Sequence, residues 1–197
     1  MLNAMRLDPD RAMVLVIDLQ ESLLPLIEHR QTILDAARFL IAGSAIFELP
    51  MLATEQYPKG IGPTDASVRS ELAKTGAEVL EKLAFSCCGD EGVRAKLRQI
   101  DREQIIVTGI ETHVCVQQTA LDLLSMDYDV FVCADAVGSR GRLDHDTALK
   151  RLAQAGAVMT TVESVLFELC GQSGTDRFKT MLALIKSRQD VVDKSRA

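Results

Sequence analysis

Residues 104–126 read QIIVTGIETHVCVQQTALDLLSM, which is a strand, a tight turn and a helix in immediate succession. The first part, Gln104–Gly109, is a short apolar run typical of a strand buried on both faces of a sheet. The last part, Thr112–Met126, places apolar residues at helical spacing. The turn between them puts Cys115 at the start of the helix, where unpaired N–H groups and the helix dipole favour an anion.

The same alternation of short strands and helices continues in both directions along the chain. Further strands are predicted at Met13–Asp18, Pro50–Thr54, Glu78–Lys82, Asp129–Asp135 and Ala157–Thr161. Further helices are predicted at Gln31–Phe47, Asp144–Ala155 and Asp176–Ile185. Because crossovers between parallel strands are nearly always right-handed, the pattern predicts a three-layer α/β/α sandwich with a six-stranded, mainly parallel sheet, a Rossmann-like architecture. Ligands of such folds bind at the carboxyl ends of the strands.

Length and composition indicate an ordinary globular protein. The 197 residues suffice for one core, so we expect a single domain over 1–197 whose polar end, 186–197, frays. The net charge is -6 and the basic residues are scattered, so we expect no nucleic-acid partner. The first ten residues lack the apolar run of a signal peptide, and no apolar stretch is long enough to span a bilayer. We therefore expect a cytoplasmic protein without a membrane partner.

The five cysteines are odd in number and show no CxxC spacing, so free thiols are expected. Burial as a small apolar side chain accounts for Cys133 and Cys170. The adjacent Cys87 and Cys88 leave open a redox-sensing role together with Cys115, which would need an exposed resolving cysteine.

Three chemically active residues follow three different predicted strands. Asp18 follows MVLVI, Lys82 follows EVLE, and Cys115 follows IIVTGIETHV. Parallel strands bring their carboxyl ends to one edge, so we expect these side chains to meet there, although Asp18 could instead cap the following helix. An ammonium and a helix N-terminus beside Cys115 would lower the pKa of its thiol, and a carboxylate could carry its proton.

The motifs around these residues resemble those of the isochorismatase-like cysteine hydrolases. VTGIETHVCVQQTALDLL resembles the nucleophile motif of that superfamily, and VLVIDLQESLL and EVLEKLAFSC resemble the segments that supply its aspartate and lysine. DAVGSR and HDTALKRLAQAGAVMTTVESVLFELC resemble its C-terminal third, so the likeness covers nearly the whole chain. TEQYPKGIGPT followed by KLAFSC is most similar to the isochorismatase domain-containing protein branch, whose substrates are poorly defined.

The resemblance implies a role for each residue. Asp18 is the general base, Lys82 orients groups and stabilises charge, and Cys115 is the nucleophile. A cis peptide between Ile110 and Glu111 is also implied, with the backbone N–H groups of Glu111 and Cys115 forming an oxyanion hole. Relatives commonly form homo-oligomers, so a homo-oligomer is expected here.

The loop after the second predicted strand decides between branches of the superfamily. A nicotinamidase relative would carry metal-binding histidines there, and TEQYPKGIGPT has none, so no catalytic metal is expected.

Gln56, Tyr57 and Phe85 are candidates for lining the pocket by position. His113 lies two residues before Cys115 and is a poor partner for it, while exposure or capping accounts for His29 and His145.

These features predict a hydrolase that cleaves a C–N bond of a small amide or ureido substrate through a thioester. GxGxxG and GxxxxGK[ST] are both absent, so no NAD or ATP is expected and no cofactor is required. The alternative is a scaffold or interaction protein that keeps the fold with little turnover.

Overall fold

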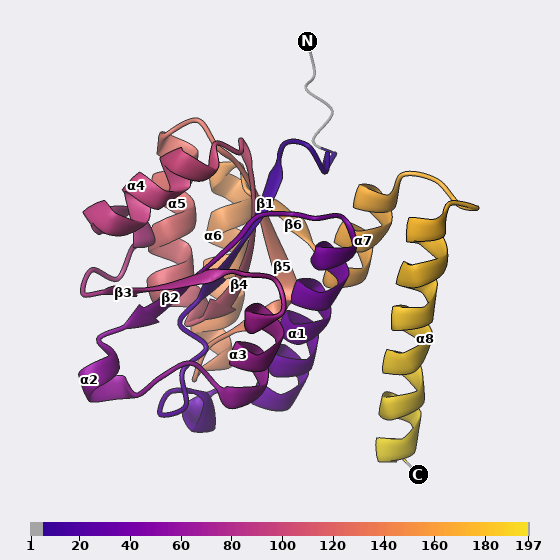
Figure 1. The fold of residues 1–197 in the computed structure, drawn as a ribbon. Helices are drawn as coiled ribbons and strands as arrows, with labels where there is room; N and C mark the ends of the chain where they lie inside the picture. The colour runs from indigo at the N-terminus through magenta and orange to yellow at the C-terminus, as the bar shows by residue number, and fades with distance from the viewer. Residues whose placement is uncertain (1–5, 197) are drawn as a thin grey trace.

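Strands with apolar side chains on both faces need a helical layer on each side, and the chain supplies both layers. The computed structural model describes residues 6–196, with side chains described through residue 188. Its strands are β1 (Ala12–Ile17), β2 (Met51–Gln56), β3 (Glu78–Lys82), β4 (Gln104–Ile110), β5 (Asp129–Gly138) and β6 (Val158–Thr160). All pairings are parallel, and the order is β3-β2-β1-β4-β5-β6 (Figure 1). The predicted α/β/α sandwich is confirmed, as are all six strands.

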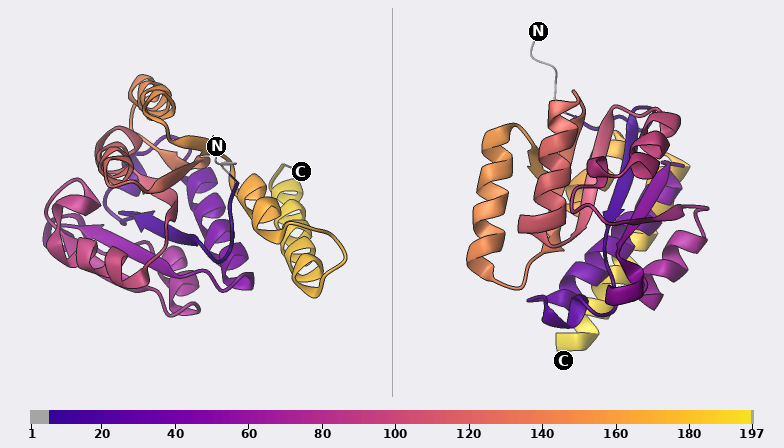
Figure 2. Two further views of the ribbon diagram at one scale, coloured as in Figure 1. Left: turned by 90° about the horizontal axis from the view of Figure 1, so that it is seen from above. Right: turned by 90° about the vertical axis from the view of Figure 1, so that its left-hand side faces the viewer.

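The helices form the two outer layers. They are α1 (Arg30–Ile46), α2 (Pro58–Ile61), α3 (Ala66–Ala73), α4 (Glu91–Ile100), α5 (Gln117–Ser125), α6 (Arg142–Ala155), α7 (Val162–Cys170) and α8 (Asp176–Arg196). Short helical turns are η1 (Leu24–Leu26), η2 (Cys87–Gly89) and the π-helical η3 (Thr112–Val116). Helices α4, α5 and α6 cover one face of the sheet, α1, α3 and α7 cover the other, and α8 packs on α1 and α7 (Figures 1 and 2).

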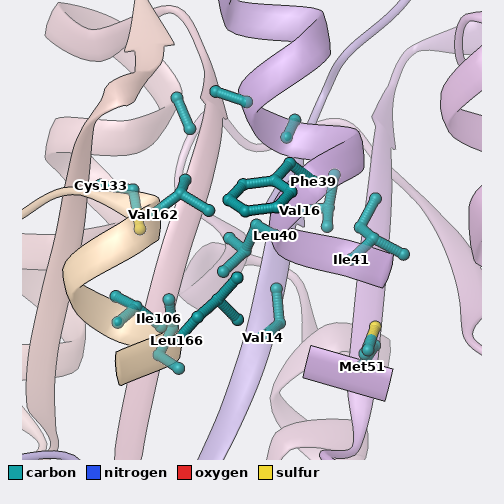
Figure 3. Packing of buried hydrophobic residues seen from close by; sticks show 14 of the residues in the cluster. Val14, Val16, Phe39, Leu40, Ile41, Met51, Ile106, Cys133, Val162 and Leu166 are labelled. Carbon is teal, nitrogen blue, oxygen red and sulfur yellow. The ribbon is translucent and has the colours of Figure 1, made fainter. Parts of the chain in front are cut away.

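Side-chain alternation along β1 divides the core in two. Val14 and Val16 pack with α1 and α7, whereas Met13, Leu15 and Ile17 pack with α4, α5 and α6. The first of these layers is seen in Figure 3, where aromatic and branched side chains of α1, α7 and the strands interlock. Because β1 is buried completely on both faces, its end is held firmly, and Asp18 is the next residue.

Several predicted elements differ in extent from the structure. The helix predicted at Thr112–Met126 begins with a π-helical turn, and the loop after β2 contains the single turn α2. The helix predicted at 176–185 continues to Arg196, through the segment expected to fray, because residues 186–196 contain no glycine or proline to end it.

Helices α3 and α4 were not predicted because each buries only one pair of apolar side chains four residues apart. Aspartate caps fix their starts instead. Asp65 accepts from the amides of Ser67 and Val68, and Asp90 accepts from those of Gly92 and Val93. Helix α7 was also not predicted, although it buries Val162, Val165, Leu166 and Leu169.

None of the helices within residues 6–196 is both long and apolar enough to cross a membrane.

Gly109 is the point at which β4 can approach β1. It pairs with Ile17, has φ +130°, and a Cβ there would lie 2.0 Å from the Ile17 carbonyl oxygen. A side chain would therefore push apart the two strand ends that carry Asp18 and the turn to Cys115.

We expect Gly109→Ala to lower the free energy of unfolding by about 3–5 kcal/mol, from strained φ and from overpacking combined. Gly156→Ala is the matched control, since Gly156 has φ +106° and a Cβ there meets nothing within 4 Å, so it should cost about 1 kcal/mol. Urea unfolding of the two variants measures the difference. Equal losses would show that the contact with Ile17 is unimportant.

Candidate active site

Asp18, Lys82 and Cys115 lie together at the carboxyl edge of the sheet. The side chains of Asp18 and Lys82 have no solvent exposure, and Cys115 is 6% exposed. The Lys82 Nζ lies 2.7 Å from Asp18 Oδ2. Asp18 has φ +51°, a strained conformation that aspartate tolerates better than most residues. The predicted meeting of the aspartate and the lysine is thus confirmed.

The Lys82 ammonium has acceptors on several sides. Besides Asp18, it donates to Gln56 Oε1 at 2.7 Å and to the carbonyls of Ala84 at 3.2 Å and Phe85 at 3.1 Å. Burial works against its charge, but Asp18 opposes burial through both its charge and its hydrogen bond, and the pKa of Lys82 lies above its usual value. The ammonium therefore stays protonated at neutral pH.

The thiol of Cys115 faces the ion pair, and its pKa is not lowered. Burial raises the pKa of Cys115 most, and the charge of Asp18 raises it further, while Lys82 lowers it. The lowered pKa expected from the helix start and the lysine is therefore wrong, because sequence indicated the cation but not the depth of burial. Cys115 is therefore a thiol at neutral pH.

The turn before Cys115 has the backbone that the family resemblance implies. The Ile110–Glu111 peptide is cis. The Glu111 carbonyl accepts from the amides of Val114 and Val116, and the amide of Cys115 is not among its donors. In a regular α-helix the Cys115 N–H would donate to the Glu111 carbonyl, four residues earlier, and here the N–H of Val116, five residues on, takes that place.

Side chains of this turn are tied to the segment after β5. Glu111 Oε2 accepts from the Arg140 amide at 2.9 Å and from its Nε at 3.1 Å. Thr112 Oγ1 lies 2.9 Å from His145 Nδ1, and His113 Nδ1 lies 3.0 Å from Ser139 Oγ. His113 thus turns to Ser139, and His145, which exposure or capping was expected to explain, contacts the turn that leads to Cys115.

The three residues expected to line the pocket differ in burial and in their contacts with Lys82. Gln56 is buried and bonds to Lys82, so it supports the site from within. Tyr57 is 50% exposed and lines a cavity of about 360 Å³ that Lys82 also borders. The Phe85 ring is 55% exposed, and only its carbonyl contacts Lys82.

Two residues that support the site through hydrogen bonds were not predicted from the sequence. Thr54 Oγ1 donates to Asp18 Oδ1 at 2.8 Å. Gln20 accepts from the Gln56 amide at 2.7 Å and donates to the Gln56 carbonyl at 3.0 Å. Both are polar residues next to buried strand ends, which is the signal that could have identified them.

The remaining cysteines offer little to a redox role. Cys87 and Cys88 are buried, and burial raises the pKa of Cys87 to about 11 and that of Cys88 to about 12. Cys133 is fully buried, and Cys170 is half-buried. Neither Cys87 nor Cys88 is the exposed resolving cysteine that a thiol switch requires.

Comparison with known proteins identifies the family of this fold. Isochorismatase domain-containing protein 1 of Danio rerio is 38% identical over 182 residues, which cover 91% of this chain and 62% of the fish protein. This chain thus spans about six tenths of that relative's length. Among solved structures, the MAR1 ribonuclease of Caenorhabditis elegans superposes with a TM-score of 0.86 at 37% identity, covering 91% of this chain and 92% of its own.

A further solved structure, the YcaC gene product of Escherichia coli, is described as an octameric hydrolase of unknown specificity. It superposes with a TM-score of 0.85 at 25% identity, covering 97% of this chain and 96% of its own. The family model for the isochorismatase domain matches residues 12–164, which is well over half of the chain. This protein therefore belongs to the isochorismatase family.

Proposed function

We propose that this protein is a cysteine hydrolase that cleaves a C–N bond of a small amide or ureido substrate through a thioester intermediate. The observation that carries the proposal is the burial of a carboxylate, an ammonium and a thiol together at one edge of the sheet. The hydrolase description of the E. coli relative supports the same class of reaction. That relative is described as octameric, and we propose that this chain forms a homo-oligomer.

The first half of the reaction uses Asp18 as a base and then as an acid. Asp18 takes the proton of the Cys115 thiol, and Sγ attacks the substrate carbonyl carbon. Lys82 compensates the charge of the pair, and the amides of Glu111 and Cys115 bind the oxyanion. Protonated Asp18 then gives its proton to the leaving nitrogen as the C–N bond breaks, releasing ammonia or an amine.

The second half returns the enzyme to its starting state. Asp18, again ionised, deprotonates a water that attacks the thioester carbonyl. The C–S bond breaks, Cys115 recovers a proton from Asp18, and an acid is released. The same carboxylate serves both steps, which fits its position between an ammonium and a thiol.

Ribonuclease activity, which the name of the C. elegans relative states, is one alternative to the proposed C–N hydrolysis. RNA binding depends on basic groups that contact phosphates, and this chain has 28 acidic against 22 basic side chains. The charge therefore favours a small substrate over a polyanion. A scaffold without turnover is the other competitor, and one screen separates all three.

We expect turnover of at least one member of a panel of small amides and ureido acids, and its loss by at least about 10³-fold in Cys115→Ala. Cys133→Ala is the matched control, because Cys133 is a fully buried cysteine on β5 outside the site. Product release is followed by ammonia detection and mass spectrometry. Cys115-dependent cleavage of single-stranded RNA alone would favour the ribonuclease, and no turnover at all would favour the scaffold.

Labelling of Cys115 tests Asp18 as its base without a known substrate. We expect iodoacetamide to modify Cys115 at pH 7 and Asp18→Asn to slow this by about 100-fold, because proton removal is lost. Mass spectrometry after brief exposure gives the rate. The carboxylate raises the pKa of Cys115, so a preformed thiolate would react faster in Asp18→Asn, and acceleration would contradict the mechanism. Asp122→Asn is the control, because Asp122 is an acid that raises the pKa of Cys88. This variant should label Cys115 at a rate within about twofold of the wild type.

We further propose that turnover needs no metal. The acids at the end of β2 and in the loop after it are already engaged, since Glu55 on β2 accepts from Thr64 and Asp65 caps α3. Chelation with EDTA should therefore leave the rate unchanged within about twofold. Loss of activity that zinc restores would show that this loop binds a catalytic ion.

A further inference from the structure

Thr54, at the end of β2, contacts Asp18 through both its backbone and its side chain. It is 1% exposed and pairs with Ile17, so it lies beside the residue that precedes Asp18. Its carbonyl accepts from the Asp18 amide at 3.1 Å, and its Oγ1 lies 2.8 Å from Asp18 Oδ1. One residue thus fixes both the backbone and the carboxylate of the proposed base.

The direction of these hydrogen bonds follows from the number of hydrogens. A carboxylate paired with an ammonium has no hydrogen to donate, so the Thr54 hydroxyl donates its single hydrogen to Asp18. Cys87 Sγ lies 3.8 Å from the same hydroxyl and can then only donate to it. Cys87 keeps its hydrogen at neutral pH, because burial and the charge of Asp18 raise its pKa to about 11. The chain of donors runs from Cys87 through Thr54 to Asp18.

The two carboxylate oxygens of Asp18 are therefore held by different partners. Thr54 holds Oδ1 from β2, and Lys82 holds Oδ2 from β3. Without the hydroxyl, the carboxylate could turn so that both oxygens face the ammonium. A base turned in this way no longer meets the thiol proton at a suitable angle.

We propose that Thr54 is a positioning residue for the reaction, which keeps one face of the Asp18 carboxylate directed at the Cys115 thiol. This inference rests on the proposed function, since it assigns Asp18 the role of base. Cys87 contributes to this positioning, because its thiol donates to the Thr54 hydroxyl and so orients it. Two buried groups outside the three reacting side chains thus set the geometry of proton transfer.

Substitution of Thr54 by valine and by serine tests the proposal. Valine keeps the shape and removes the hydroxyl, and serine keeps the hydroxyl. We expect Thr54→Val to slow labelling of Cys115 by iodoacetamide about tenfold at pH 7, and Thr54→Ser to stay within about threefold of the wild type. The Thr54 variants should slow turnover in the same order, with the loss in kcat rather than KM.

Thr108→Val is the matched control for the loss of a buried hydroxyl. Thr108 is fully buried on β4, and its Oγ1 donates to the Ala136 carbonyl at 2.6 Å rather than to the site. We expect Thr54→Val and Thr108→Val to lower the melting temperature alike, and only Thr54→Val to slow labelling. If Thr54→Val does not fold, Thr54→Ala, which also lacks the hydroxyl, decides in its place.

Two different failures can be told apart. Labelling in Thr54→Val within twofold of the wild type, or slowed equally in Thr108→Val, would overturn the role of Thr54 and leave the hydrolase proposal intact. Wild-type Cys115 that reacts no faster than the buried Cys133 would overturn both.

Discussion

The buried ion pair between Lys82 and Asp18 is the constraint around which the site is built. Two charges without solvent contact are costly unless every remaining hydrogen-bonding group is satisfied. The fold meets this demand from three directions, with Thr54 on the aspartate, Gln56 on the lysine and two backbone carbonyls from the segment after β3. Removing either charge would leave the other uncompensated, which typically costs about 3–5 kcal/mol.

This arrangement determines the protonation state of Cys115. Activated cysteines are often thiolates stabilised by a nearby cation. Here burial and the Asp18 carboxylate outweigh Lys82, so Cys115 rests as a thiol. In the mechanism that we propose, Asp18 remains paired with the Lys82 ammonium and takes the thiol proton when a substrate carbonyl is in place. A resting thiol is also less open to oxidation than a thiolate.

The sequence predicts the strands and the meeting of Asp18 with Lys82 because both depend on local pattern and on parallel topology. Each strand is a short apolar run, and a polar residue at its carboxyl end must lie at the common edge. Thr54 could be noticed as a polar residue near a strand end, but its contact with Asp18 could not be predicted, because that contact depends on β2 lying beside β1, and strand order is set by packing of the whole domain. The direction of the Cys115 pKa shift depends on how deeply its thiol is buried. The sequence of the strand and helix around Cys115 does not determine that depth.

Strand order also explains where the chemistry is located. Asp18 and Lys82 come from the half of the sheet formed by β1, β2 and β3, and Cys115 follows β4 in the other half. The order of the strands reverses between β1 and β4, where open α/β sheets form a crevice for ligands. On the β4 side, the turn before Cys115 is held by Arg140, Ser139 and His145, all beyond β5. Asp18 and Cys115 are thus fixed by separate halves of the sheet, and these halves pair at the close approach of Gly109 to Ile17.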